Sequence, residues 1–212
     1  MLVPLVAVHW IALLVFAQSV PRNGWLFYQG GDQTFFYTDA WVLADGHIPE
    51  SKVGYAWSLL LVPLPALLGS SFLAAVPAIV LLQTLVLAPV ALLAVYGIGA
   101  RIGGRAVGYG AVALWVAAPF LSIPLFVDRY HEKFVEQFLP QALGLTGLGD
   151  YPSTVALLVS AYFLVRCLDT RAPAEAVLGG LAAGLAVGIK PANALFLAGP
   201  ALAFLVGRRW RE

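Results

Sequence analysis

The chain has 212 residues, of which 61% are hydrophobic and only 11% carry a charged side chain. Soluble domains carry about a quarter charged residues, so this composition, with a mean hydropathy of +0.87, predicts an integral membrane protein. The net charge of +1 gives no indication of nucleic-acid binding, and the single cysteine, Cys167, excludes an internal disulfide.

A membrane span needs roughly 20 apolar residues, and six segments are candidates. In chain order they are Met1–Val20, Phe72–Ala100, Ala106–Phe126, Ser153–Cys167, Ala176–Ile189 and Ala192–Val206. The first lacks the basic start of a signal peptide, so we interpret it as a retained span. The second contains Pro77 and Pro89, which predict a kink. The last two are short and predict a tight hairpin that turns at "KPAN", Lys190 to Asn193.

The segment Gly54–Gly69, "GYAWSLLLVPLPALLG", is ambiguous. Because Pro63 and Pro65 interrupt it, we interpret it as interfacial or half-inserted rather than as a span. Six spans place both termini, and seven of the twelve basic residues, on one side, while eight of the eleven acids lie on the other. A seventh span here would divide the basic residues nine against three and put the acidic loop inside, which the positive-inside rule alone favours.

Two long polar stretches decide between these topologies. If the chain has six spans, loop one (Pro21–Val53) and loop two (Leu121–Pro152) both lie on the outer face. If it has seven, the two loops lie on opposite faces and cannot form a joint site. We therefore expect an all-α fold. It is a single polytopic transmembrane module over residues 1–212, with about six spans and juxtamembrane helices in both outer loops.

Loop one concentrates acids in "GGDQTFFYTDAWVLADGHIP", Gly30 to Pro49. The pattern predicts a short helix that ends at Gly46. Asp39 and Asp45 fit the exposed face of this helix. Asp32 is either the N-cap of the helix or a functional acid, and the spacing alone does not decide between the two.

Loop two contains "FVDRYHEKFVEQFLPQAL", whose apolar residues fall on one stripe of a helix. This pattern predicts an amphipathic helix in the membrane interface. Its charged face is either solvated and internally paired, or part of a lid with Arg129 or His131 facing a substrate. Asp150 directly precedes the fourth span and is likewise a cap or a functional acid. Two such carboxylates, one from each loop, could hold a divalent cation or divide base and metal roles.

Lys190 follows a glycine-rich span and reaches the outer surface in the six-span topology. It either snorkels to the interface or supplies a positive charge to a phosphate at the level of the lipid headgroups. Gly180, Gly184 and Gly188 recur every four residues and predict a ridge for close helix packing. We expect His9, in the first span, to be packed and hydrogen-bonded rather than a ligand.

In their order and spacing these stretches resemble the N-terminal half of the GT-C superfamily. The resemblance rests on "GGDQTFFYTDAWVLADGHIP" and "VGYAWSLLLVPLPALLGSS" after the first apolar segment, on "YGIGARIGGRAVGYGAVALWVAAP", and on "LGGLAAGLAVGIKPANALFLAGPALAFLVGRRWR". The superfamily consists of polytopic glycosyltransferases that take sugar from a polyprenyl-phosphate carrier. The most similar group is the protein O-mannosyltransferase and aminoarabinose-transferase-like set.

The resemblance implies a hexosyl or pentosyl transferase in the cell inner (plasma) membrane. It would move a sugar from a polyprenyl-phosphate carrier to an acceptor hydroxyl at the outer face, with the lipid bilayer and the lipid-linked sugar as its partners. Asp32 matches the family's acid near the acceptor, and Asp150 matches a later acid that sometimes joins it through a metal. Lys190 matches the basic residue that meets the carrier phosphate. Asp32 is then the catalytic residue, and Asp32 with Asp150 would hold the divalent cation. The residues expected to contact the substrate are Gln33, Arg129, His131 and Lys190. No nucleotide is expected, because the sequence contains no Walker or Rossmann fingerprint.

The alternative is a non-catalytic membrane protein. The family's loop acid is often part of an acidic pair, whereas Asp32 lies between Gly31 and Gln33, and family members usually continue through more spans. The chain would then be a truncated GT-C-like scaffold, a subunit completed by a second membrane polypeptide, or a lipid-carrier-binding transporter component. Transporters more often place ionisable residues in mid-span, where this chain has only His9.

Overall fold

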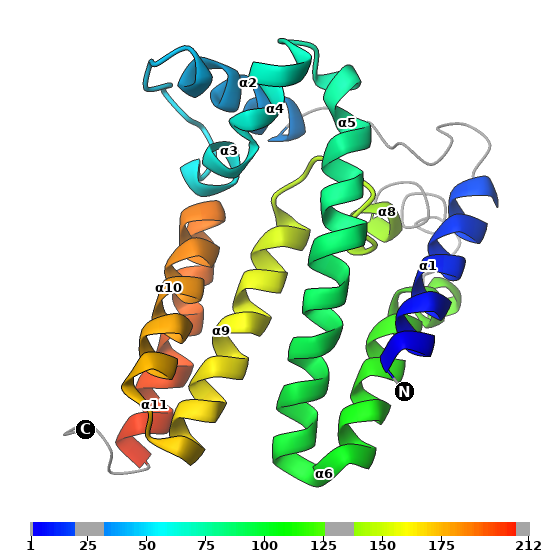
Figure 1. The fold of residues 1–212 in the computed structure, drawn as a ribbon, viewed down its shortest axis with the longest axis vertical. Coiled ribbons are helices and arrows are strands. Elements are labelled where there is room, and N and C mark those ends of the chain that lie inside the picture. The colour runs from blue at the N-terminus through cyan, green and yellow to red at the C-terminus, as the bar shows by residue number, and fades with distance from the viewer. Residues whose placement is uncertain (1, 20–31, 126–137, 207–212) are drawn as a thin grey trace.

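The computed structural model describes residues 2–19, 32–125 and 138–206, and every regular element within them is helical, which confirms the all-α expectation. Long helices run side by side and short helices gather at one end (Figure 1). The rods are built from α1 Leu2–Ser19, α5 Phe72–Leu81, α6 Ala88–Leu121, α9 Asp150–Thr170, α10 Pro173–Ile189 and α11 Ala198–Val206. The remaining α-helices are α2 Asp32–Ala44, α3 Tyr55–Leu61, α4 Pro63–Leu68 and α8 Leu139–Ala142. A π-helical segment spans Leu82–Leu87, and 3-10 segments span Ile123–Leu125 and Pro191–Leu197.

Two helical stretches, Phe72–Leu121 and Asp150–Thr170, are long and apolar enough to cross a membrane. The first of them folds back on itself, because Gly103 and Gly104 leave the helical conformation (Figure 1). Gly104 has a φ of 81°, which favours a residue without a Cβ. The stretch therefore forms two antiparallel arms. Shorter apolar helices cover Val3–Leu13, Tyr55–Leu68, Pro173–Ile189 and Pro191–Val206.

The first arm contains the irregularity that its two prolines predict. Between Pro77 and Pro89 the helix widens into the π-helical segment, where the Ala88 N–H bonds to the Gln83 carbonyl five residues back. Proline removes a backbone donor and crowds the preceding turn, and a π turn is one way for a helix to accommodate that loss. The segment carries the fully buried side chain of Gln83.

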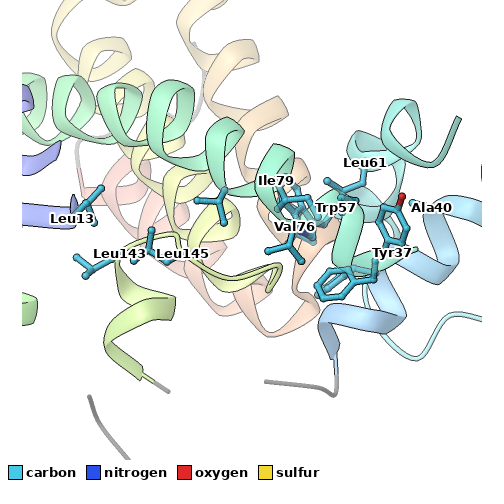
Figure 2. Packing of buried hydrophobic residues seen from close by; sticks show 14 of the residues in the cluster. Leu13, Tyr37, Ala40, Trp57, Leu61, Val76, Ile79, Leu143 and Leu145 are labelled. Atoms are coloured by element: carbon cyan, nitrogen blue, oxygen red, sulfur yellow. The ribbon is translucent and has the colours of Figure 1, made fainter. Parts of the chain in front are cut away.

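The largest apolar core lies at the end of the molecule that holds α2, α3 and α4, which we call the loop end. There Gly54–Gly69 forms α3 and α4, two short helices that meet at Val62 instead of one long rod. Trp57 and Leu61 are buried against α5 residues such as Ile79 (Figure 2). The Tyr37 hydroxyl, whose pKa is raised by burial, donates to the Gly69 carbonyl at 2.7 Å.

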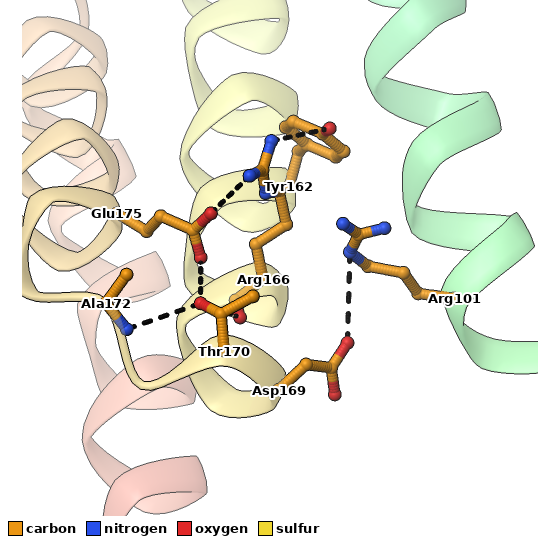
Figure 3. Close-up of polar contacts among 7 residues, drawn as sticks. All are labelled: Arg101, Tyr162, Arg166, Asp169, Thr170, Ala172 and Glu175. Carbon is orange, nitrogen blue, oxygen red and sulfur yellow. Dashed lines mark hydrogen bonds and ion pairs between the residues drawn. The ribbon is translucent and has the colours of Figure 1, made fainter.

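The opposite end, which we call the turn end, holds the α6 hairpin and the α9–α10 turn. Arg166 Nη2 pairs with Glu175 Oε1 at 2.5 Å, and the Thr170 hydroxyl donates to the other Glu175 oxygen (Figure 3). Arg101 lies 3.8 Å from Asp169 and links α6 to α9. Glu175 is buried, so this network is a specific clamp on the α9–α10 hairpin rather than a loose surface pair.

The predicted glycine ridge on α10 is wrong for two of its three members. A Cβ at Gly180 or Gly184 would meet nothing within 4 Å, so these residues face away from the packed helices. The close contact with α9 is made one residue earlier, where a Cβ on Gly179 would lie 2.9 Å from the Leu164 side chain. The four-residue spacing was compatible with either face, and tertiary packing selected the other one.

One glycine does determine how the loop end docks on α10. A Cβ built on Gly54 would lie 2.6 Å from the carbonyl carbon of Ile189 and even closer to the carbonyl oxygens of Gly188 and Ile189. These are backbone atoms at the end of a packed helix, so they cannot move aside cheaply. Gly54 therefore permits α3 to meet the end of α10 directly.

Gly54→Ala should lower the melting temperature of the purified protein, because overpacking against backbone costs about 1–3 kcal/mol. Gly184→Ala is the matched control: its Cβ enters open space, so the melting temperature should stay the same or rise slightly. Thermal unfolding in one detergent measures both. Equal melting temperatures for Gly54→Ala and the wild type would contradict this account.

Candidate functional site

A small charged pocket lies at the loop end, where segments distant in sequence meet. Its volume is 170 Å³, and its charged lining residues are Asp32, Lys52, Asp150 and Lys190. The apolar and glycine lining includes Phe36, Val53, Gly54, Gly149, Ile189 and Pro191. The pocket thus joins the start of α2, the loop before α3, the start of α9 and the end of α10. We call it the charged pocket.

Both acids of the pocket are the first residues of helices. Asp32 begins α2 and Asp150 begins α9, where a carboxylate is favoured by the positive end of the helix dipole. The N-cap of α9 is Gly149, which makes no side-chain capping bond, so Asp150 is not the cap that its position suggested. Its carboxylate instead accepts a hydrogen bond from Lys190 Nζ and forms an ion pair with it.

Lys190 reaches Asp150 because the chain turns sharply after α10. Lys190 is in an extended conformation and is followed by the 3-10 segment from Pro191, so the predicted turn at "KPAN" is confirmed. The Asn193 side-chain amide donates to the Ser153 hydroxyl at 2.6 Å and to the Ala186 carbonyl at 2.9 Å. These bonds fix the turn against α9.

Lys52 is a member of the pocket that the sequence analysis missed. It lies in the segment between α2 and α3, with its ammonium 5.3 Å from the centre of the Phe35 ring. The neighbouring Ser51 hydroxyl donates to the Asp39 carboxylate and also receives the Val53 N–H at 3.2 Å. No local pattern around Lys52 predicts its position, because that position depends on this loop docking against α2.

Asp39 corrects a second expectation. It was assigned to the exposed face of its helix, but its side chain is buried and bonded to Ser51. The exposed acid is Asp45, which lies 3.6 Å from His47 and outside the pocket lining. Asp39 therefore holds the loop that carries Lys52, while Asp45 faces solvent.

Gln33, expected to contact the substrate, lies in the interior instead. Its side chain is fully buried, and its Oε1 accepts the backbone N–H of Gly147 at 2.8 Å. Gln83 donates to the Thr146 carbonyl at 2.6 Å, and the Trp57 indole donates to the Gly147 carbonyl at 3.2 Å. Three side chains, from loop one, α3 and the first arm, thus hold the segment that leads to Asp150.

The segment before Asp150 needs glycine for this fit. A Cβ on Gly147 would lie 2.9 Å from the Phe72 ring, and one on Gly149 would lie 2.8 Å from the Phe36 ring. The "GLGD" sequence (Gly147 to Asp150) therefore lets the end of loop two pass closely over the core. The described parts of loop one and loop two therefore meet at the same end of the molecule.

Two predicted site residues, Arg129 and His131, lie outside the described residues, as do residues 126–137 of the segment predicted to form the amphipathic helix. Among the residues that the structure does describe, no group of three or more His, Cys, Asp or Glu side chains is placed to hold a metal ion. The acids that share the charged pocket are two, Asp32 and Asp150, accompanied by two lysines. The cation predicted at Asp32 and Asp150 remains a prediction.

Comparison of the chain with protein-family models, with curated proteins and with solved structures gives no match.

Gln33→Leu should destabilise the fold, because it leaves the buried Gly147 N–H without an acceptor. Such a loss costs about 1–3 kcal/mol, or roughly 2–12 °C in melting temperature for a chain of this size. Thr38→Ala, on the exposed face of the same helix, is the control and should leave the melting temperature unchanged. If Gln33→Leu melts with the wild type, Gln33 does not hold loop two.

Proposed function

We propose that this chain is a membrane glycosyltransferase that moves a sugar from a polyprenyl-phosphate carrier to an acceptor hydroxyl. The reaction takes place at the outer face of the plasma membrane. The observation that supports this most is the charged pocket, which places acids of both outer loops beside two lysines at one end of an apolar helical bundle. The resemblance to the GT-C superfamily supplies the reaction class.

The membrane topology that goes with this function has six spans. They are α1, the two arms of Phe72–Leu121, α9, α10 and the rod Pro191–Val206. This topology puts the charged pocket outside and the turn end in the cytoplasm. Four arginines of the described residues then lie at the cytoplasmic end, in agreement with the positive-inside rule: Arg101, Arg105, Arg166 and Arg171.

The lysines suit the phosphate of the carrier. An ammonium is a compact positive charge that binds phosphate oxygens, and Lys52 and Lys190 line the same pocket from different segments. Lys190 is half exposed and paired with Asp150, so a phosphate can recruit it by exchanging one anionic partner for another. The ion pair keeps Lys190 directed into the pocket before the carrier binds.

Asp32 is the base in this mechanism. Its carboxylate takes the proton from the acceptor hydroxyl while that oxygen bonds to the anomeric carbon of the sugar. The bond from the anomeric carbon to the phosphate oxygen breaks, and the phosphate leaves with the electron pair. Lys52 and Lys190 stabilise the negative charge that grows on the leaving phosphate. Arg129 and His131 complete the contacts with the substrate from loop two.

Asp32→Asn should abolish transfer while leaving the fold intact, because an amide cannot accept the proton; general-base catalysis contributes about 10²–10⁴-fold in rate. The assay uses proteoliposomes and two donors, a polyprenyl-phosphate hexose and a polyprenyl-phosphate pentose, each radiolabelled in the sugar. Asp45→Asn is the matched control, because Asp45 is an exposed acid of the same loop outside the pocket, and it should transfer at the wild-type rate. Unchanged transfer by Asp32→Asn would remove Asp32 from the mechanism.

Lys190→Gln separates phosphate binding from proton transfer. We expect this variant to raise the KM for the lipid-linked sugar about tenfold, the equivalent of one charge-assisted hydrogen bond. Its kcat should fall as well, because Lys190 also stabilises the charge on the leaving phosphate. Asp32→Asn should instead reduce kcat with little effect on KM. If the wild type binds polyprenyl phosphate but transfers no sugar from either donor, the chain is a carrier-binding subunit rather than an enzyme.

A divalent cation bound by the Asp32 and Asp150 carboxylates is part of this proposal. Paired carboxylates are the ligands that Mg²⁺ and Ca²⁺ prefer, but Lys190 already pairs with one of them. A bound cation would therefore displace Lys190 from Asp150. If the cation is used, EDTA should stop transfer and MgCl₂ should restore it. Full activity in EDTA would show that transfer does not need the cation.

A further inference from the structure

A second and larger cavity lies behind the charged pocket, between α1, the second arm of α6, α8 and α9. Its volume is 490 Å³, within the range of sites that hold small ligands. Aromatic and aliphatic side chains such as Trp115, Pro119 and Phe138 make up most of its wall. Asp150 lines both cavities, so the apolar cavity and the charged pocket adjoin at the start of α9.

Two polar side chains in this wall have no partner among the described residues. His9 is 4% exposed and Tyr151 is 6% exposed. The expected hydrogen bond of His9 is wrong: neither of its ring nitrogens finds a partner within the described part of the chain, and the Tyr151 hydroxyl finds none either. Buried polar groups are nearly always hydrogen-bonded, because their desolvation is otherwise uncompensated. These two groups, both lining one cavity, point to a bound molecule that supplies the missing partners.

The lining indicates the chemistry of that molecule. Asp150 is the one charged side chain among the described residues of the wall, and its negative charge disfavours a phosphate here. A neutral imidazole presents a donor and an acceptor on two separate nitrogens, and a hydroxyl group can bond to either one of them. We infer that the cavity binds a neutral amphipathic alcohol. Its chain lies against Trp115 and Phe138, and its hydroxyl group bonds to His9 and Tyr151.

This binding does not depend on sugar transfer. Asp32 lines the charged pocket, whereas the alcohol's hydroxyl is held by His9 and Tyr151, so the alcohol is not the acceptor of the proposed transfer. The alcohol and the phosphorylated carrier would then occupy different cavities. A direct binding experiment distinguishes failure of this inference from failure of the proposed enzyme activity.

The test is photolabelling in nanodiscs with a 16-carbon alcohol that carries a diazirine in its chain, mapped by mass spectrometry. Two probes with the same chain, the methyl ether and the phosphate monoester, serve as comparisons. We expect the alcohol to label peptides containing Trp115 or Tyr151 about tenfold more than either comparison probe, the equivalent of one lost hydrogen bond. Equal labelling by alcohol and ether would overturn the hydrogen-bonding role. Equal labelling by the phosphate would assign the cavity to a phosphorylated lipid.

Variants locate the hydroxyl contact. His9→Leu and Tyr151→Phe should each reduce labelling by the alcohol about tenfold. Ser122→Ala is the matched control: Ser122 also lines the cavity, but its hydroxyl already donates to the Ala118 carbonyl at 2.8 Å, so labelling should not change. Tyr151→Phe removes a single unpartnered oxygen, so its melting temperature without alcohol should not fall. Unchanged labelling in Tyr151→Phe and in folded His9→Leu would refute the inference.

Discussion

The position of Asp150 depends on three hydrogen bonds to the loop that precedes it. Gln33 accepts the Gly147 N–H, Gln83 donates to the Thr146 carbonyl, and Trp57 donates to the Gly147 carbonyl. All three side chains are almost completely buried, so each bond is made where water cannot replace it. Because these side chains come from α2, the π-helical segment and α3, this single loop ties the first half of the chain to the second.

The same contacts explain why the charged pocket forms where the helices end. A bundle of apolar rods in a membrane gains little from hydrophobic association along its length, since lipid is as apolar as the rods. At the loop end the situation differs, because the short helices bury Trp57, Tyr37 and Leu61 in a compact core. That core fixes the position of α2 relative to the segment before α9. The acids at the two helix starts, Asp32 and Asp150, therefore face one shared space.

Much of this arrangement could be predicted from the chain alone. Composition and proline spacing predicted an all-helical fold, a broken segment at Gly54–Gly69 and a turn at Lys190. The expectation that both loops share one end follows from counting spans, and it placed Asp32, Asp150 and Lys190 near one another. These features are local, or depend only on the order of the apolar segments. Their catalytic and binding roles remain proposals.

What could not be predicted depends on contacts between distant segments. The "DQ" of Asp32 and Gln33 gives no sign that one side chain enters the pocket and the next enters the core. Asp39 lies on a helix whose pattern suggests an exposed acid, yet the docking of Ser51 buries it. The position of Lys52 in the charged pocket also depends on a distant segment, and so does the packing of Gly179 rather than Gly180 against α9. In each case the sequence allows two faces, and a partner far along the chain determines which one is buried.

Asp150 lines both cavities, and its carboxylate pairs with Lys190 in the charged pocket. The pocket thus brings together two carboxylates and two lysines. A phosphate that takes Lys190 away would leave the Asp150 carboxylate without its ammonium partner. The cost of that loss reduces the net gain from the new phosphate contact. Asp150 therefore holds Lys190 in the pocket and also limits how strongly Lys190 can bind an anion.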